Sequence, residues 1–215
     1  MDTKEKIIQK ADELFRLYGM RSVTMDDISK GLGISKKTIY QYYSDKDEIV
    51  TRATRHMLEH EQQEIEEISQ GSKNALDELF EISRCIRKNV TNINPSILFE
   101  LQKYHAKAWE IYLDFKEHAF KKTITQNLER GIKEGFFRKE IDIEVLALMR
   151  LEQFQMIFDQ RIFPSTQFDF AKVQTQILEH FIYGILTEKG RALYEEKVAN
   201  ASEQEASRTE ASSDA

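Results

Sequence analysis

The chain has 215 residues, of which 40% are hydrophobic and 32% charged, and its formal net charge is −6 at pH 7. These values are typical of one or two globular domains and exclude a fibrous or low-complexity chain. A single cysteine excludes an internal disulfide and a cysteine-cluster zinc site. The N-terminus has no signal-peptide pattern and no apolar run could cross a bilayer, so we expect a cytoplasmic protein without membrane partners.

Helical spacing of apolar residues and the absence of strand-like alternation predict an all-α fold of about nine helices. The first helix is predicted over residues 3–18, where one apolar stripe ends at Gly19. Thr24 and Asp27 form the capping pattern that starts a second helix. Ser35 is placed to cap a third helix.

Residues 24–46 are the most informative stretch, because two short helices follow one another across a tight turn. Gly31 and Gly33 bracket that turn, where we expect positive φ angles. Such a pair can lay its second helix in the major groove of DNA. Ile39 and Tyr43 are predicted to face inward, which leaves an outward face of Lys36, Lys37, Thr38, Tyr40 and Gln41. Residues 1–46 carry nine Lys and Arg against seven Asp and Glu, so the N-terminal region is locally basic on an acidic chain.

The rest of the chain reads as further helices, predicted near 45–69, 73–91, 95–103, 106–134, 142–161 and 169–187. Beyond Tyr194 the sequence has no aromatic residue and a surplus of acid. We therefore predict a disordered acidic tail over residues 195–215.

The N-terminal segment resembles the DNA-binding signature of the TetR-like (tetracycline-repressor-like) transcriptional regulators. The matching positions, in order and spacing, are Phe15 to Gly19, Thr24, Ile28, Ser29, Gly33-Ile34-Ser35, Thr38-Ile39-Tyr40, Tyr42-Tyr43 and Lys46. The resemblance covers about the first fifty residues, and Lys37 stands where the family often has a small residue. We therefore expect Lys37 to influence the choice of operator.

The resemblance implies a helix-turn-helix DNA-binding domain over 1–47 and a helical effector-binding and dimerisation domain over 48–194. It also implies phosphate contacts from Thr24, Tyr40 and Lys46, with Lys46 at a helix N-terminus. The full set of candidate DNA contacts is Thr24, Ser35, Lys36, Lys37, Thr38, Tyr40, Gln41, Tyr42 and Lys46.

The two C-terminal helical segments are apolar on more than one face, which is more than internal packing requires. The surplus suits a four-helix interface with a second copy of the chain, as the resemblance also implies. The alternative is that both helices lie wholly inside the core of one chain. Candidate interface residues are Leu151, Phe158, Ile177, Phe181 and Ile185.

Residues 97–120 are rich in aromatic side chains with polar groups between them. Because the resemblance implies a cavity among the central helices, we predict an effector pocket for an apolar or aromatic small molecule. Its candidate residues are Phe99, Tyr104, His105, Trp109, Tyr112 and Phe154. The alternative is that these are ordinary core aromatics.

Two other functions are weighed against this one. His56, Glu59 and His60 match the H-x-x-E-H pattern of zinc peptidases, which would make a zinc-dependent hydrolase or a regulatory metal site. A ligand-independent DNA-binding or adaptor protein is also compatible with the sequence. With no phosphate-binding loop, nucleophile elbow or dinucleotide motif, we predict no enzyme, metal or cofactor. The favoured hypothesis is a homodimeric repressor that leaves a roughly palindromic DNA operator when a small effector binds.

Overall fold

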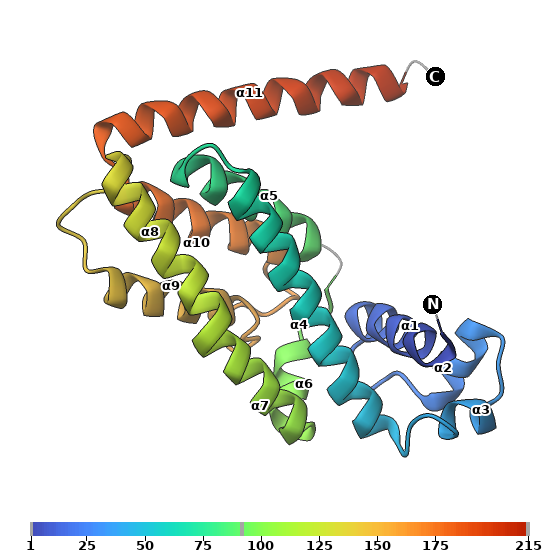
Figure 1. Ribbon diagram of the computed structural model, residues 1–215. Coiled ribbons are helices and arrows are strands. Elements are labelled where there is room, and N and C mark those ends of the chain that lie inside the picture. Colours follow the sequence, from blue (N-terminus) through green and yellow to red (C-terminus); the bar gives the residue numbers. More distant parts are fainter. Residues whose placement is uncertain (1, 91–92, 214–215) are drawn as a thin grey trace.

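The computed structural model describes residues 2–90 and 93–213, and in that part the chain is helical (Figure 1). One isolated antiparallel bridge, Phe137 to Leu186, interrupts this pattern. The helices are α1 (Thr3–Tyr18), α2 (Met25–Leu32), α3 (Lys36–Tyr40), α4 (Lys46–Gly71), α5 (Ala75–Val90), α6 (Ile97–Tyr104), α7 (Ala106–Phe115), the π-helical turn η1 (Lys116–Phe120), α8 (Lys121–Glu134), α9 (Ile143–Ile157), α10 (Phe170–Ile185) and α11 (Glu188–Ser213). The all-α prediction is confirmed. None of the described helices combines the length and apolarity that crossing a membrane requires.

The first three helices form a compact head because their apolar residues meet at one point. Ile7, Phe15, Ile28, Ile39 and Tyr43 are all buried there. The Tyr43 hydroxyl donates a hydrogen bond of 3.0 Å to the Lys4 carbonyl, which satisfies its polar end. These contacts fix the angle between α1 and the α2–α3 pair.

The caps predicted for α2 and α3 are confirmed. The Thr24 side chain accepts from the Asp27 N–H at 3.2 Å, and Asp27 accepts from the Thr24 N–H at 2.8 Å. The Ser35 side chain accepts from the Thr38 N–H at 3.1 Å. Gly33 ends α2 with φ at +66°, as a left-handed cap requires.

The expectation of positive φ at Gly31 is wrong. Gly31 lies inside α2, and positive φ among the described residues is confined to Gly19, Gly33 and Gly135. A Cβ at Gly31 would come within 3.1 Å of the Lys10 side chain. The small residue is therefore explained by the close packing of α1, not by backbone conformation.

Helix α4 joins the head to the body (Figure 1). It packs mainly against α1 on one side and α7 on the other. Its Ile49, Val50 and Leu58 belong to the same buried core as Leu101 and Ile157 of the body. One apolar core therefore continues across residue 47, the predicted boundary between domains.

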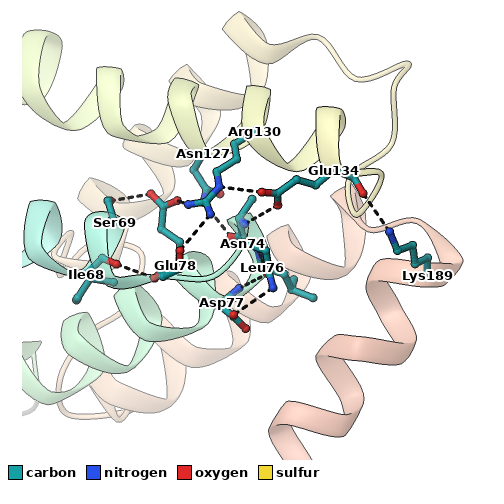
Figure 2. A network of polar contacts seen from close by, with 12 residues as sticks. Ile68, Ser69, Asn74, Leu76, Asp77, Glu78, Asn127, Arg130, Glu134 and Lys189 are labelled. Carbon is teal, nitrogen blue, oxygen red and sulfur yellow. Dashed lines mark hydrogen bonds and ion pairs between the residues drawn. The ribbon is translucent and has the colours of Figure 1, made fainter.

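A polar network anchors the far end of α4 (Figure 2). Ser69 donates to Glu78 at 2.7 Å, and Arg130 of α8 pairs with Glu78 at 3.3 Å. Arg130 also donates to the Ser72 carbonyl at 3.1 Å and pairs with Glu134 at 2.9 Å. Since Glu78 is almost fully buried, its pairing with Arg130 offsets the cost of removing its charge from water.

The body differs from the predicted helices in three places. The segment predicted as one helix over 106–134 contains the π-helical turn η1 in its middle. The helices predicted over 142–161 and 169–187 end sooner, at Ile157 and Ile185. The described residues form eleven α-helices and one π-helical turn where about nine helices were predicted, because η1 divides 106–134 into α7 and α8 and because α11 follows α10.

Within residues 195–215, the segment predicted as a disordered tail, the described backbone continues α11 as a helix to Ser213, and residues 214 and 215 lie outside the described residues. The segment has low hydrophobicity but also many residues of high helix propensity, mainly Ala and Glu, which favour a helical backbone. The start of α11 is held to the body by Tyr194, whose ring packs edge-on against Phe80 and Tyr183. Helix α11 lies at the end of the body away from α2 and α3 (Figure 1).

Candidate DNA interface and internal cavity

The outward face of α3 is polar and exposed, as predicted. Lys36, Lys37, Tyr40, Gln41 and Tyr42 are exposed, and 52% of Tyr40 is accessible although it is a large aromatic residue. The inward face of the same short helix buries Ile39 completely. The head thus presents hydrogen-bonding groups in a convex row of the kind that fits a major groove.

The two lysines of this face have different surroundings. Lys36 pairs with Asp26 of α2 at 3.2 Å, with both side chains about half exposed. In the described part of the chain, no hydrogen bond or ion pair engages Lys37. Lys37 can therefore approach DNA without giving up a partner, whereas Lys36 must exchange a weak surface ion pair.

Thr24 and Lys46, the two candidate phosphate-binding residues beside this face, each already make a hydrogen bond within the protein. The Thr24 hydroxyl donates to Asp27 at 2.6 Å, and these hydrogen bonds lower the pKa of the Asp27 carboxyl. Lys46 donates to the Arg21 carbonyl at 3.3 Å, and burial lowers the pKa of its ammonium group. Both groups lie at helix N-termini, where a phosphate is also attracted by free N–H groups.

The body encloses a cavity of about 140 Å³ between α4, α5, the α7–η1–α8 segment, α9 and α10. Most of its wall is aliphatic or aromatic, and two of the predicted pocket residues, Tyr112 and Phe154, line it. The π-helical turn contributes Lys116 and Phe120. Such turns inside helices occur frequently at functional sites.

The other four predicted pocket residues lie elsewhere, which corrects the prediction. Phe99 and Tyr104 are 53% and 43% exposed on the surface of α6. His105 hydrogen-bonds Asp47 of α4 at 2.7 Å. Trp109 stands outside the cavity wall and stacks on Tyr112 with ring centroids 5.0 Å apart. Because α6 is short and ends at Tyr104, the aromatic cluster is divided between α6 and α7.

Three charged side chains reach the cavity wall: Glu61, Lys116 and Arg150. Glu61 pairs with Arg16 of α1 at 3.4 Å, and Lys116 pairs with Glu152 at 2.6 Å. Burial raises the pKa of Glu61, and the Arg16 charge opposes that effect. The Glu61–Arg16 pair directly connects the cavity wall to the DNA-binding head.

Arg150 was not among the residues predicted from the sequence, and it is buried in the structure. Desolvation lowers the pKa of its guanidinium to about 10. The signal was present in the sequence as one arginine in the otherwise apolar run of residues 145–151. A single cation within a long apolar run is informative, because buried arginines are rare unless they are paired.

Most of the predicted dimer residues are unsuitable for contact with a second chain. Leu151, Phe158, Phe181 and Ile185 are buried within the single chain, so the prediction is wrong for these four. Ile177 is partly buried and packs on the same core. The exposed apolar residues of α9 are instead Val145, Leu148 and Met149, which lie at helical spacing on one face.

Among the described residues, the fold does not complete a metal site around His56, Glu59 and His60. Glu59 and His60 are exposed, and His60 lies 3.7 Å from Glu64. No group of three or more His, Cys, Asp or Glu side chains in the described residues is arranged to hold a metal.

A helix-turn-helix head on a helical body defines a DNA-binding transcriptional regulator. Residues 7–53 match the family model described as bacterial regulatory proteins of the tetR family. The N-terminal head therefore carries the DNA-binding domain of the TetR-like regulators.

Two relatives and one solved structure illustrate this similarity. An uncharacterized HTH-type transcriptional regulator of Bacillus subtilis, YvaF, is 28% identical over 82% of this chain and 94% of its own length. The HTH-type transcriptional repressor KstR2 of Mycobacterium tuberculosis is 22% identical over 66% of this chain and 72% of its own. A regulator from Saccharomonospora viridis, solved in complex with choline, has a TM-score of 0.67 at 17% identity, over 86% of this chain and 98% of that one.

Proposed function

We propose that this chain is a homodimeric repressor that binds a roughly palindromic operator and leaves it when a small molecule fills the body cavity. The observation that carries the proposal is the double role of α4. Its N-terminus holds Lys46 beside the DNA face, and its middle contributes Glu61 and Ile65 to the cavity wall. A ligand that favours one position of α4 would therefore alter the head directly.

Contacts at both ends of α4 support this coupling. Near the head, Asp47 is bonded to His105 at the junction of α6 and α7, and Glu61 is paired with Arg16. At the far end, α4 is attached to α5 and α8 through Glu78 and Arg130. We propose that residues 1–47 act as the DNA-binding head and residues 48–194 as the effector-binding and dimerising body.

On the DNA side, we assign base-edge reading to Lys36, Lys37 and Thr38 of α3 and to Gln41 at its C-cap. Lysine can donate to guanine, and glutamine can pair with adenine through two hydrogen bonds. Thr24, Tyr40, Tyr42 and Lys46 surround this group and would contact phosphates, with Ser35 at the helix start. Phosphate contacts would give orientation and salt dependence, while base contacts would give the sequence preference.

A second copy of the chain would cover the apolar face of Val145, Leu148 and Met149 on α9. A short recognition helix makes few contacts, so pairing two heads supplies the affinity and half-site spacing that one head lacks. A contiguous apolar face is costly on a monomer surface and is typical of an interface. This exposed face of α9 replaces the buried residues that were predicted from the sequence as the dimer interface.

In vitro selection of DNA from a random pool by the full chain tests the proposal. We expect enrichment of an inverted repeat whose half-sites lie about one helical turn or more apart. We also expect its binding to weaken steeply as salt rises. Recovery of unrelated sequences without a shared motif would refute sequence-specific binding, and a ligand screen against the selected operator then tests release.

A further inference from the structure

Arg150 is a buried cation that has no acidic partner in the described part of the chain. It lies on α9 with 7% of its surface exposed, and its guanidinium is part of the cavity wall. Its Nη1 atom has no hydrogen-bond partner among the described residues. Its guanidinium lies over the ring of Phe181, whose centroid is 5.7 Å from the guanidinium carbon. An aromatic face attracts a cation weakly and cannot replace an anion.

The other charged groups of the cavity already have partners. Lys116 donates to Glu152 and Gln155, both at 2.6 Å, and Glu61 is paired with Arg16. The lowered pKa of Arg150, about 10, still leaves it protonated near neutral pH. Arg150 is therefore the cavity cation without an acidic partner among the described residues, which is an unfavourable state for a buried charge.

The uncharged polar groups of the wall are mostly engaged as well. Ser83, Thr123 and Asn127 each donate to a backbone carbonyl within the protein. A ligand entering the cavity would therefore find its strongest free donor in Arg150. The remaining surface, which includes Phe154, Leu178 and Phe181, is apolar.

We propose that the effector of this cavity is a small monocarboxylate, held by Arg150 through its carboxylate and by the apolar wall through an aliphatic or aromatic body. The planar guanidinium matches a carboxylate with two parallel hydrogen bonds. One free cation balances a single negative charge and leaves a phosphate dianion undercompensated. The cavity volume of about 140 Å³ is close to that of a protein cavity known to hold benzene, about 150 Å³, so the body has roughly six to eight carbon atoms.

This inference rests on the proposed function, because it assumes that the cavity is the effector site. Its direct test needs no DNA. Trp109, the single tryptophan, stacks on the cavity residue Tyr112 and gives a fluorescence signal, with calorimetry as the second measurement. The ligands are hexanoate, octanoate, benzoate and phenylacetate, each compared with the alcohol of the same carbon skeleton.

We expect at least one acid to bind the full-length protein tenfold or more tightly than its alcohol. Arg150→Met should remove that preference while keeping the affinity for the alcohol. Lys116→Met is the matched control, because it removes a cavity cation that already has partners, and it should keep the preference. Equal binding of acids and alcohols, no binding of any acid, or an unchanged preference in Arg150→Met would each overturn the proposal.

Thermal unfolding distinguishes a binding role from a structural one. Without ligand, Arg150→Met should unfold at the same temperature as the natural chain or higher, because it removes an unpaired buried charge. With the acid, the natural chain should gain thermal stability and the variant should not. A variant that unfolds earlier or fails to fold would assign Arg150 to structure and overturn the proposal; the acid–alcohol comparison on the natural chain does not depend on the variant.

Operator binding without ligand is measured separately on the natural chain. If the operator is bound with sequence specificity and no acid binds, the ligand class fails while the DNA-binding regulator stands. If an acid binds with the expected dependence on Arg150 but does not release DNA, the carboxylate site stands and the effector-release mechanism fails.

Discussion

Lys37 is exposed on the DNA face and, unlike Lys36, has no ion pair in the described structure. We expect Lys37→Ala to change which bases the protein prefers at one position of each half-site, with a loss of about 1–3 kcal/mol for the preferred base. Binding to a panel of single-base operator variants measures this change. Lys122→Ala, on the exposed surface of α8, is the control and should leave the preference intact. An unaltered base preference in Lys37→Ala would remove this residue from base reading.

Tyr40 differs from Lys37 because a phosphate contact carries no sequence information. Tyr40→Phe removes the hydroxyl of a side chain that is 52% exposed, and it should weaken binding to all DNA sites by about 0.5–1.5 kcal/mol. The ratio of affinities between operator variants should stay constant. Tyr18→Phe, an exposed tyrosine at the end of α1, is the matched control. A change in that ratio would show that Tyr40 reads bases.

At the scale of elements, two glycines inside helices predict opposite effects of the same substitution. A Cβ at Gly131 of α8 would lie 2.0 Å from the ring of Phe137, whereas a Cβ at Gly184 of α10 would meet nothing within 4 Å. Gly131→Ala should destabilise the protein by about 1–3 kcal/mol through overpacking. Gly184→Ala should stabilise it by about 0.5–1 kcal/mol, because alanine restricts the unfolded chain. Urea unfolding compares the two, and stabilisation by both would contradict the packing of α8 on Phe137.

The sequence predicted an element well where several local signals agreed. Helix α1 begins and ends as expected because its apolar stripe coincides with the stop at Gly19. The π-helical turn within 106–134 was missed because no proline or glycine marks it. The helix at the C-terminus was missed because composition was given more weight than helix propensity.

The reach of local sequence patterns also explains why the DNA face was predicted well and the cavity only in part. The outward face of α3 follows from the spacing of Ile39 and Tyr43 along one short segment, so it could be read locally. The cavity depends on how five helical segments of the body pack together, which no local pattern contains. Tyr112 and Phe154 therefore line it, while Phe99 and Tyr104 of the same aromatic group lie on the surface. Arg150 became informative when its burial and its missing counter-charge were known.

At the scale of the whole molecule, the head and the body share one apolar core and are not joined by a hinge. The core around α1, α4 and α7 is continuous, and the Glu61–Arg16 pair crosses from the cavity wall to the head. A change in the cavity can therefore reach the DNA face through packed side chains and one ion pair. Signalling in this architecture requires two positions of α4 whose balance the ligand alters.

A dimer interface must hold the two heads at a fixed separation, so disrupting the proposed interface on α9 should impair operator binding. Leu148 on α9 and Leu113 on α7 are each 41% exposed, so they form a matched pair. We expect Leu148→Glu to raise the dimer dissociation constant at least tenfold, which corresponds to about 1.4 kcal/mol. Leu113→Glu should leave the dimer intact, because it places the same charge on a surface outside the proposed interface.

Sedimentation over a range of protein concentrations measures the dissociation constant, and operator binding is recorded on the same samples. If α9 forms the interface, Leu148→Glu should lose operator affinity at concentrations where it is monomeric and regain it when more protein drives dimerisation. Thermal unfolding checks that both variants remain folded. A natural chain that sediments as a monomer would refute the homodimer. An unchanged dimer in Leu148→Glu would move the interface to another face, because a glutamate buried against its own symmetry copy is strongly disfavoured.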